Sequence, residues 1–299
     1  MPFLDFDQAW RAYREAASRL PPAPPPVTPR RIAAIAEIAD DFDLVVLDAW
    51  GVLNLADSVI PTAPPAVAEL RRRGKRLAVL SNDGGSDTAM AVAKHRRRGF
   101  DFTAGEIIAG IDLLAETLAT LPPVETLGLI ADDPLPYAEL TNRMVRLGDR
   151  AEDYDAVAAF IFLSSDTWSE ARQTLLRASL ARRNRPLIIG NPDIVSPGPD
   201  AIAVEPGYYA HRLAAEFAVA PSFLGKPYAA IYRRLAARHP DIAPNRVLCV
   251  GDTPQTDILG GRAAGYRTLL IEDGFCRGRD ALALCRECGI WPDFIASRL

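Results

Sequence analysis

The chain has 299 residues, of which 49% are hydrophobic and 24% are charged. This composition is typical of a globular protein and excludes a chain that is disordered throughout. The formal net charge of −4 and the pI near 5.5 argue against nucleic acid or an anionic membrane as the main partner. No apolar run approaches the roughly 18 residues of a membrane span. The first residues lack the pattern of a secretory signal, and the four cysteines are too few for a disulfide framework, so we expect a cytoplasmic protein.

The first 29 residues combine a helical pattern with a proline-rich stretch. Apolar side chains within residues 4–19 recur at helical spacing and predict a short amphipathic helix. Residues 21–29 are rich in proline, which fixes φ and removes backbone donors, so this stretch is predicted as an extended tether. We therefore expect residues 1–29 to form an N-terminal arm laid across the main domain.

From residue 30 onward, strand-like and helix-like patterns alternate. Short apolar runs predict buried parallel strands, and the segments between them predict helices. The predicted strands are 44–47, 76–80, 246–250 and 268–271, and the predicted helices include 63–73, 86–98, 106–120, 208–217 and 256–264. This alternation implies an α/β fold with a doubly wound, Rossmann-like parallel sheet.

A second strand–helix series interrupts the first. Pro122-Pro123 breaks the chain, and predicted strands follow at 126–130, 157–163, 187–189 and 201–204. We interpret this block as an inserted α/β domain. The predicted organisation is a core of residues 30–121 and 207–299 and an inserted cap of residues 122–206.

Polar side chains follow several of the predicted core strands. Asp48 comes directly after one apolar strand, Ser81-Asn82 after the next, and Asp252 and Asp257 after a third, while Lys226 lies in a tight corner. Ligands of open parallel sheets bind at the carboxyl ends of the strands. Carboxylates held close together need a cation. The set therefore suits a phosphate group bridged by a hard metal ion.

These segments resemble the ordered motifs of the haloacid dehalogenase (HAD) superfamily. The matching segments are Asp48-Ala49-Trp50-Gly51-Val52-Leu53, Ser81-Asn82, Gly225-Lys226-Pro227 and Gly251-Asp252-Thr253-Pro254-Gln255-Thr256-Asp257. In addition, Asn191-Pro192-Asp193 and Pro206-Gly207 resemble the NagD-like class IIA branch. The resemblance covers residues 40–275. It implies an HAD core with an inserted α/β cap and a phosphatase of pyridoxal phosphate, phosphoglycolate, nucleotide or sugar phosphates.

The resemblance also implies a nucleophile and a metal site. Asp48 would attack phosphorus and form an aspartyl phosphate. Asp48, the main-chain carbonyl of Trp50 and Asp252 would bind Mg²⁺. Asp257 would be either an additional ligand of the ion or a residue that bonds to one of its ligands. Alternatively, Asp257 only caps the helix that follows.

The remaining candidate residues would contact the substrate. By the same resemblance, Ser81 and Asn82 would hydrogen-bond the phosphoryl group, and Lys226 would neutralise its charge. Asn191 and Asp193 would reach the site from the cap, although an Asn-Pro-Asp sequence is also typical of a plain turn. The branch also implies a homodimer formed through the cap.

Trp50 departs from the pattern of the superfamily's phosphatases. They usually carry an aspartate at this position, which protonates the leaving oxygen and later activates water. Indole cannot accept a proton, and general acid–base help is typically worth 10²–10⁴-fold. We therefore expect weak turnover that favours good leaving groups. Trp50 itself either fills space beside the site or stacks on a substrate ring.

Two other functions compete with the phosphatase. One is a catalytically degenerate protein that binds a phosphorylated metabolite, which the missing acid favours. The other is carbon–halogen hydrolysis, because haloacid dehalogenases carry an aromatic residue at the position of Trp50. The carboxylates of Asp252 and Asp257 disfavour the latter, since they would repel anionic substrates unless a cation is present.

The remaining unusual residues have no predicted chemical role. His95, His211 and His239 show no ligand spacing and are predicted to lie on the surface. Cys285 and Cys288 are interpreted as reduced helix thiols, because no second cysteine pair accompanies them.

Overall fold

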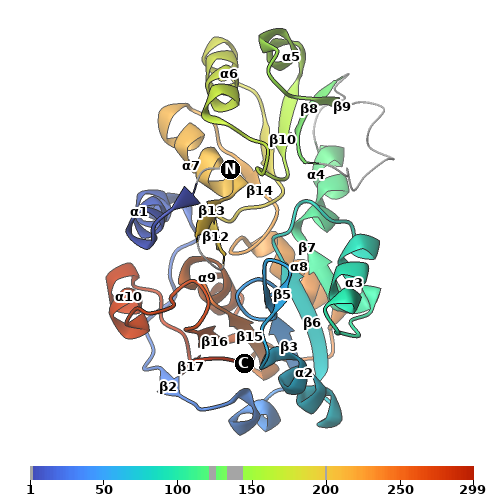
Figure 1. The fold of residues 1–299 in the computed structure, drawn as a ribbon, viewed down its shortest axis with the longest axis vertical. Helices are drawn as coiled ribbons and strands as arrows, with labels where there is room; N and C mark the ends of the chain where they lie inside the picture. The colour runs from blue at the N-terminus through green and yellow to red at the C-terminus, as the bar shows by residue number, and fades with distance from the viewer. Residues whose placement is uncertain (1–2, 121–125, 133–143, 199–200) are drawn as a thin grey trace.

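The computed structural model describes residues 3–120, 126–132, 144–198 and 201–299 (Figure 1). The larger lobe contains a seven-stranded sheet in the order β2-β17-β16-β15-β3-β6-β7, and every neighbouring pair in it is parallel. Its strands are β2 (Arg30–Arg31), β3 (Leu44–Leu47), β6 (Arg76–Ser81), β7 (Ile107–Ala109), β15 (Val247–Gly251), β16 (Arg267–Ile271) and β17 (Phe294–Ala296).

The order of the strands creates a switch point between β3 and β15. From β3 the chain proceeds outward through β6 and β7, and from β15 it proceeds the other way through β16 and β17. The two strands pair in parallel with Leu47 beside Val250, and the Asp48 amide donates to the Val250 carbonyl at 2.9 Å. The residues that follow these two strands are therefore neighbours at the carboxyl edge of the sheet, where such folds bind ligands.

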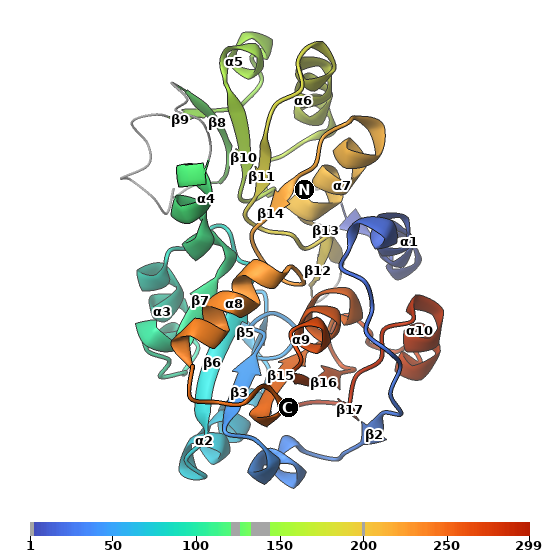
Figure 2. The ribbon, with the colours of Figure 1, turned by 180° about the vertical axis from the view of Figure 1, so that it is seen from behind.

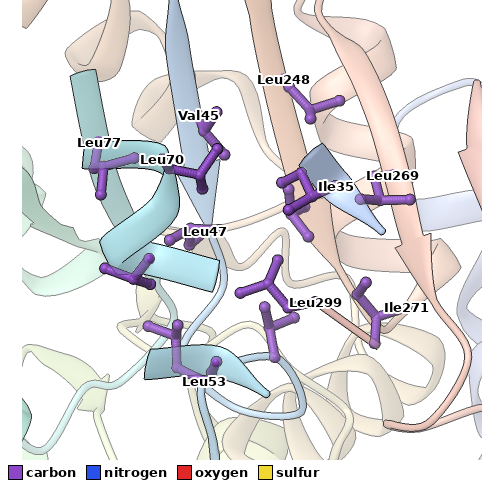
Figure 3. Close-up of a cluster of buried hydrophobic side chains, with 14 of the residues drawn as sticks. Ile35, Val45, Leu47, Leu53, Leu70, Leu77, Leu248, Leu269, Ile271 and Leu299 are labelled. Carbon is purple, nitrogen blue, oxygen red and sulfur yellow. The ribbon is translucent and has the colours of Figure 1, made fainter. Parts of the chain in front are cut away.

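Helices cover both faces of this sheet (Figures 1 and 2). One face packs against α2 (Ala63–Arg72) and α3 (Thr88–Arg97), and the other against α4 (Leu114–Thr120) and α8 (Ala229–Arg238). Figure 3 shows the first of these layers, in which Leu47 and Leu70 are fully buried. Burying a leucine contributes roughly 1.5–3 kcal/mol. This layer therefore anchors the strands that carry the candidate site.

The smaller lobe contains a second parallel sheet, in the order β14-β11-β10-β8-β9. Its strands are β8 (Leu127–Ile130), β9 (Met144–Arg146), β10 (Ala159–Phe162), β11 (Leu187–Ile189) and β14 (Ser222–Phe223). The helices of this lobe are α5 (Ala151–Ala156), α6 (Glu170–Arg182) and α7 (Pro206–Glu216), and they pack on one aromatic-rich face. The two parallel sheets confirm the predicted α/β fold.

The predicted limits of the inserted domain stay a prediction. Pro122-Pro123, predicted to begin it, lie outside the described residues. At the other end, the smaller sheet takes its edge strand from β14, which lies beyond residue 206.

A small antiparallel sheet, β1-β13-β12, joins the N-terminus to the smaller lobe. It consists of β1 (Phe3–Leu4), β12 (Val195–Pro197) and β13 (Ile202–Val204). The predicted N-terminal helix is α1 (Phe6–Ala16), which a capping box between Asp5 and Gln8 begins. The remaining elements are the hairpin β4 (Asn54–Leu55) and β5 (Ser58–Val59), the helices α9 (Leu259–Ala263) and α10 (Ala281–Cys288), and short 3₁₀ or π turns.

The structure differs from the sequence analysis at two elements. Residues 106–120 were expected to be one helix, but β7 occupies its start because a short apolar run suits a buried strand equally well. The strand β17 near the C-terminus was not foreseen.

His95 and His211 are buried rather than exposed. His95 packs edge-on against Phe102 and His211 stacks on Phe223, and burial lowers the pKa of both imidazoles to about 4. Among the described residues, no helix is long and apolar enough to cross a membrane.

Candidate active site

Charged side chains from separate segments converge at the carboxyl edge of the large sheet. Asp48 follows β3, and Asp252 and Asp257 follow β15. Each of these carboxylates offers an oxygen within 4.8 Å of the other two. Between them, Lys226 Nζ lies 2.6 Å from Asp48 Oδ1 and 2.7 Å from Asp257 Oδ1. The structure thus brings the predicted nucleophile, the predicted metal ligands and the predicted phosphate-binding lysine together.

The Asp252 carboxylate is fixed by neighbours on both sides. Thr253 Oγ1 donates to one of its oxygens at 2.9 Å, and the Phe275 amide donates to the other at 2.8 Å. Gly51 approaches it so closely that a Cβ there would lie 1.8 Å from Asp252 Oδ2, and its φ of +81° also favours glycine. The glycine after Trp50 is therefore required by the packing of the site.

Burial shapes the protonation of this cluster. Burial, then the charge of Asp257, raises the pKa of Asp252 to about 7, and the same two causes raise the pKa of Asp48 well above its usual range. Burial alone would lower the pKa of Lys226, but the carboxylates of Asp257 and Asp48 outweigh it and raise that pKa. One ammonium group does not offset three buried carboxylates, so without a further cation Asp48 and Asp252 tend to bind protons.

The donor set fits a hard divalent cation. Its ligand atoms are carboxylate oxygens, which Mg²⁺ prefers, and their mutual repulsion is the energetic reason to bind one. Asp48, Asp252 and Asp257 would hold such an ion. That the carbonyl of Trp50 joins them stays a prediction.

The phosphate-binding candidates lie beside this cluster. Asn82 Oδ1 accepts from the Lys226 amide at 2.8 Å, and Asn82 Nδ2 donates to the Lys226 carbonyl at 3.1 Å. Gly225 permits this contact, because a Cβ there would lie 2.2 Å from Asn82 Oδ1. Ser81 Oγ accepts from the Asp83 amide at 3.1 Å and faces the cavity described below. Asn82 thus ties the end of β6 to the corner that presents Lys226.

The Asn-Pro-Asp segment reaches the site from the smaller lobe. Asp193 Oδ1 accepts from Asn82 Nδ2 at 2.8 Å, so Asp193 touches a predicted phosphate-binding residue. Asn191 Nδ2 donates to Glu205 Oε2 at 2.9 Å, and Ser196 Oγ donates to Glu205 Oε1 at 2.5 Å. Burial raises the pKa of Asp193 to about 6 and that of Glu205 to about 8. Glu205 was not foreseen, and no spacing in the sequence distinguishes it.

Trp50 lies at the boundary between the two lobes. Its side chain is 36% exposed, and its Nε1 donates to the carbonyl of Pro197 in β12. The indole therefore forms a hydrogen bond to the smaller lobe, and this position offers the site no carboxyl group.

A cavity of about 440 Å³ lies beside the carboxylate cluster, with Asp48 in its wall. The larger lobe contributes Asp48, Trp50, Ser81, Asn82 and Lys94 to its walls, and the smaller lobe contributes Asp132, Asp166, Asn191, Asp193 and Glu205. Lys94, which was not singled out from the sequence, also lines the cavity and pairs with Asp83 at 3.0 Å. Burial would raise the pKa of Asp83, yet Lys94 and Ser86 together lower it.

Two family descriptions match the chain, one toward each end. Residues 45–146 match the haloacid dehalogenase-like hydrolases, and residues 223–299 match the HAD-hydrolase-like family. Mouse (Mus musculus) chronophin is 27% identical over 261 residues, which are 85% of this chain and 88% of chronophin.

Solved structures share the fold at lower identity. A possible sugar phosphatase of the HAD superfamily from Cytophaga hutchinsonii superposes with a TM-score of 0.78 at 21% identity, covering 91% of this chain and 98% of that one. A glycerol phosphate phosphatase from Mycobacterium tuberculosis in complex with magnesium superposes with a TM-score of 0.67 at 22% identity, covering 86% and 75%. The chain is therefore similar to haloacid dehalogenase-like hydrolases over these two ranges and to chronophin over most of its length, and it shares the fold of a putative NagD protein.

Proposed function

We propose that this protein is a Mg²⁺-dependent phosphatase that hydrolyses a small phosphorylated metabolite through an aspartyl phosphate on Asp48. The observation that carries the proposal is the cluster in which Lys226 Nζ lies within 2.7 Å of both Asp48 and Asp257, with Asp252 beside them. The similarity to chronophin and to phosphatases of sugar phosphate and glycerol phosphate supports the same reaction class.

Each residue of the cluster has a distinct task in this proposal. Asp48 Oδ attacks phosphorus, and the bond to the leaving oxygen breaks. Lys226 balances negative charge on the phosphoryl oxygens as a compact, desolvated ammonium. Ser81 Oγ donates a hydrogen bond that orients the phosphoryl group. Asn82, whose Nδ2 hydrogens bond Asp193 and the Lys226 carbonyl, acts by holding the corner that presents Lys226. When bound by Asp48, Asp252 and Asp257, Mg²⁺ would supply further positive charge at the phosphoryl group.

Trp50 makes the proposed phosphatase weak. No acid at this position protonates the leaving oxygen, and no base there activates water for the second step. Aryl or acyl phosphates, whose leaving groups need no proton, are therefore the expected substrates of highest turnover.

The proposed substrate selectivity comes from the smaller lobe. We assign residues 122–206 to the cap, which α7 and β14 complete, and the rest of residues 30–121 and 207–299 to the core. Asn191 and Asp193 contact the organic part of the substrate in this proposal, because both line the cavity from the cap side. A homodimer formed through the cap and a cytoplasmic location complete the proposal.

The test is phosphate release from a panel of phosphorylated metabolites and 4-nitrophenyl phosphate, with Mg²⁺ and with a chelator. We expect release with Mg²⁺ that the chelator abolishes and that Asp48→Asn lacks. Release that persists in Asp48→Asn would contradict the proposal.

A second candidate is a phospho-metabolite binding protein without turnover, and the engaged indole of Trp50 favours it. It predicts tight binding of one panel member in calorimetry together with no phosphate release. Carbon–halogen hydrolysis is the weakest candidate, because three clustered carboxylates repel an anionic substrate unless a metal is present.

A further inference from the structure

The N-terminal arm contacts both lobes at their junction. At one end, β1 pairs with β13 of the smaller lobe, with Phe3 beside Ala203 and Leu4 beside Ile202. Directly after the arm, β2 (Arg30–Arg31) pairs with β17 at the edge of the large sheet. Both ribbon views show α1 between the β12–β13 hairpin and α10 (Figures 1 and 2). The arm therefore spans the two lobes.

The buried face of α1 packs against the segment that fixes Asp252. The rings of Phe6 and Tyr13 lie 5.3 Å and 5.7 Å from the ring of Phe275, and Trp10 stacks on it at 6.4 Å. The backbone amide of the same Phe275 donates to Asp252 Oδ2. Helix α1 thus supports the residue whose amide orients a candidate metal ligand.

The same helix packs against the segment that carries Asp193. Ile194 and Val195, which follow Asp193 directly, are buried in one apolar cluster with Trp10 and Tyr13. Burial, then the charges of Asp193 and Asp252, raises the pKa of Tyr13 well above its ordinary value, which is consistent with this proximity. One helix therefore backs both the core side and the cap side of the cavity.

The β12–β13 hairpin is held from a second direction by Trp50. The indole Nε1 donates to Pro197 of β12, while β1 occupies the outer edge of β13. The hairpin is consequently bonded to the larger lobe through Trp50 and to the arm through β1.

We propose that residues 3–16 form a brace that positions the Asp252 carboxylate and the Asp193 segment and holds the smaller lobe against the larger one. The brace acts through Phe275 and Ile194, and none of its residues touches substrate in this proposal. The metal-binding part of the proposal rests on the proposed function, and the mechanical part does not.

The test compares Trp10→Ala and Tyr13→Ala with the matched control Arg11→Ala, whose side chain is exposed on the same helix. Isothermal titration with MgCl₂ alone gives the Mg²⁺ affinity, and hydrogen–deuterium exchange reports on residues 193–197 and 274–276. We expect roughly 10-fold weaker Mg²⁺ binding and faster exchange in both segments for the two brace variants, as when outer-shell support of a metal site is lost. Arg11→Ala should match the wild type. Folded brace variants with unchanged affinity and exchange would overturn the proposal.

If the brace variants do not fold, exchange of the wild-type protein in dilute urea decides the question. The brace predicts that amides of residues 6–16 and 274–276 become exposed in one opening event. Opening of α1 at lower urea without faster exchange at 274–276 would overturn the proposal. If the wild type binds Mg²⁺ but releases no phosphate, the proposed function fails, and Mg²⁺ titration and hydrogen exchange of the variants still test the brace. If it binds no Mg²⁺, exchange alone tests the brace.

Discussion

The two sides of the cavity are built in different ways. On the core side, Asp48, Lys226 and Asp257 come from segments far apart in the sequence, and Lys226 Nζ lies 2.6 Å from Asp48 and 2.7 Å from Asp257. On the cap side, hydrogen bonds link loops of the smaller lobe to one another: Asp132 accepts from the Asp166 and Thr167 amides at 2.9 Å, and Asn191 Nδ2 donates to Glu205 Oε2 at 2.9 Å. The parallel sheet thus places the reacting groups, while loops of the smaller lobe shape the space around them. In the proposed function, chemistry and substrate choice therefore have separate structural origins.

The largest effect is expected from removing the ammonium group that joins the core-side carboxylates. Lys226→Met leaves Asp48 and Asp257 without their cation, so phosphate release should fall about 10²–10³-fold. The free energy of unfolding without Mg²⁺ should fall by about 3–5 kcal/mol, as for other buried ion pairs broken on one side. Lys75→Met, at a lysine outside the cavity, is the control. Equal rates for the two variants would contradict the assignment of Lys226.

The next largest effect is an increase in the rate of hydrolysis, and we expect it from replacing Trp50 at the boundary between the two lobes. Trp50→Asp supplies a proton donor and acceptor, so hydrolysis of alkyl phosphates should rise about 10²-fold. Trp50→Phe also removes the hydrogen bond to Pro197 but adds no acid. It therefore distinguishes the effect of the new carboxylate from the effect of losing that bond between the lobes. A similar gain in both variants would show that the indole restrains the lobes and that acid–base help is not what is missing.

A third prediction concerns the packing of the core side. Gly51→Ala introduces a Cβ that overlaps Asp252 Oδ2 and occupies a positive φ. We expect about 1–3 kcal/mol lower stability and weaker Mg²⁺ binding. Gly74→Ala has a comparable φ of +71° but open space around its Cβ, so it isolates the backbone cost. Unchanged Mg²⁺ affinity in Gly51→Ala would contradict the proposed role of Asp252.

The smallest effect is expected on the cap side, from Glu205. Its pKa is 4.5 as a free side chain and about 8 in the folded protein, chiefly because of burial. The folded state thus holds a proton that the unfolded state has lost, so the stability present below pH 4.5 declines as the pH rises toward 8. Glu205→Gln should flatten this decline and be more stable than the wild type at pH 8 by on the order of 2 kcal/mol. Glu15→Gln, at an exposed position, is the control. If the stability of Glu205→Gln depends on pH as that of the wild type does, the raised pKa is wrongly assigned to Glu205.

The cluster of Asp48, Asp252 and Lys226 could be predicted from the sequence, as could the approach of Asn191 and Asp193 from the cap, whereas other cavity residues could not. Asp48 and Asp252 follow apolar runs, and parallel strands align their carboxyl ends, so their proximity follows from topology. Lys226 was identified instead from the Gly225-Lys226-Pro227 motif.

The missed features depend on tertiary packing. Glu205 and Lys94 line the cavity through loop and helix positions that no periodicity specifies. The strand β7 was missed because three apolar residues fit a helix and a buried strand equally well. The brace formed by α1 was foreseen only as an arm, since helical spacing does not name the surface that a helix covers.

The most direct test of the central claim is the mass of the protein after acid quenching of a reaction with 4-nitrophenyl phosphate and Mg²⁺. Because Trp50 leaves water without a base, the second step should be slow, and the aspartyl phosphate should accumulate. The account predicts one added phosphoryl group on the peptide that contains Asp48, sensitive to hydroxylamine and missing in Asp48→Asn. Steady release of 4-nitrophenol with no phosphoryl group on that peptide, or undiminished release by Asp48→Asn, would contradict it.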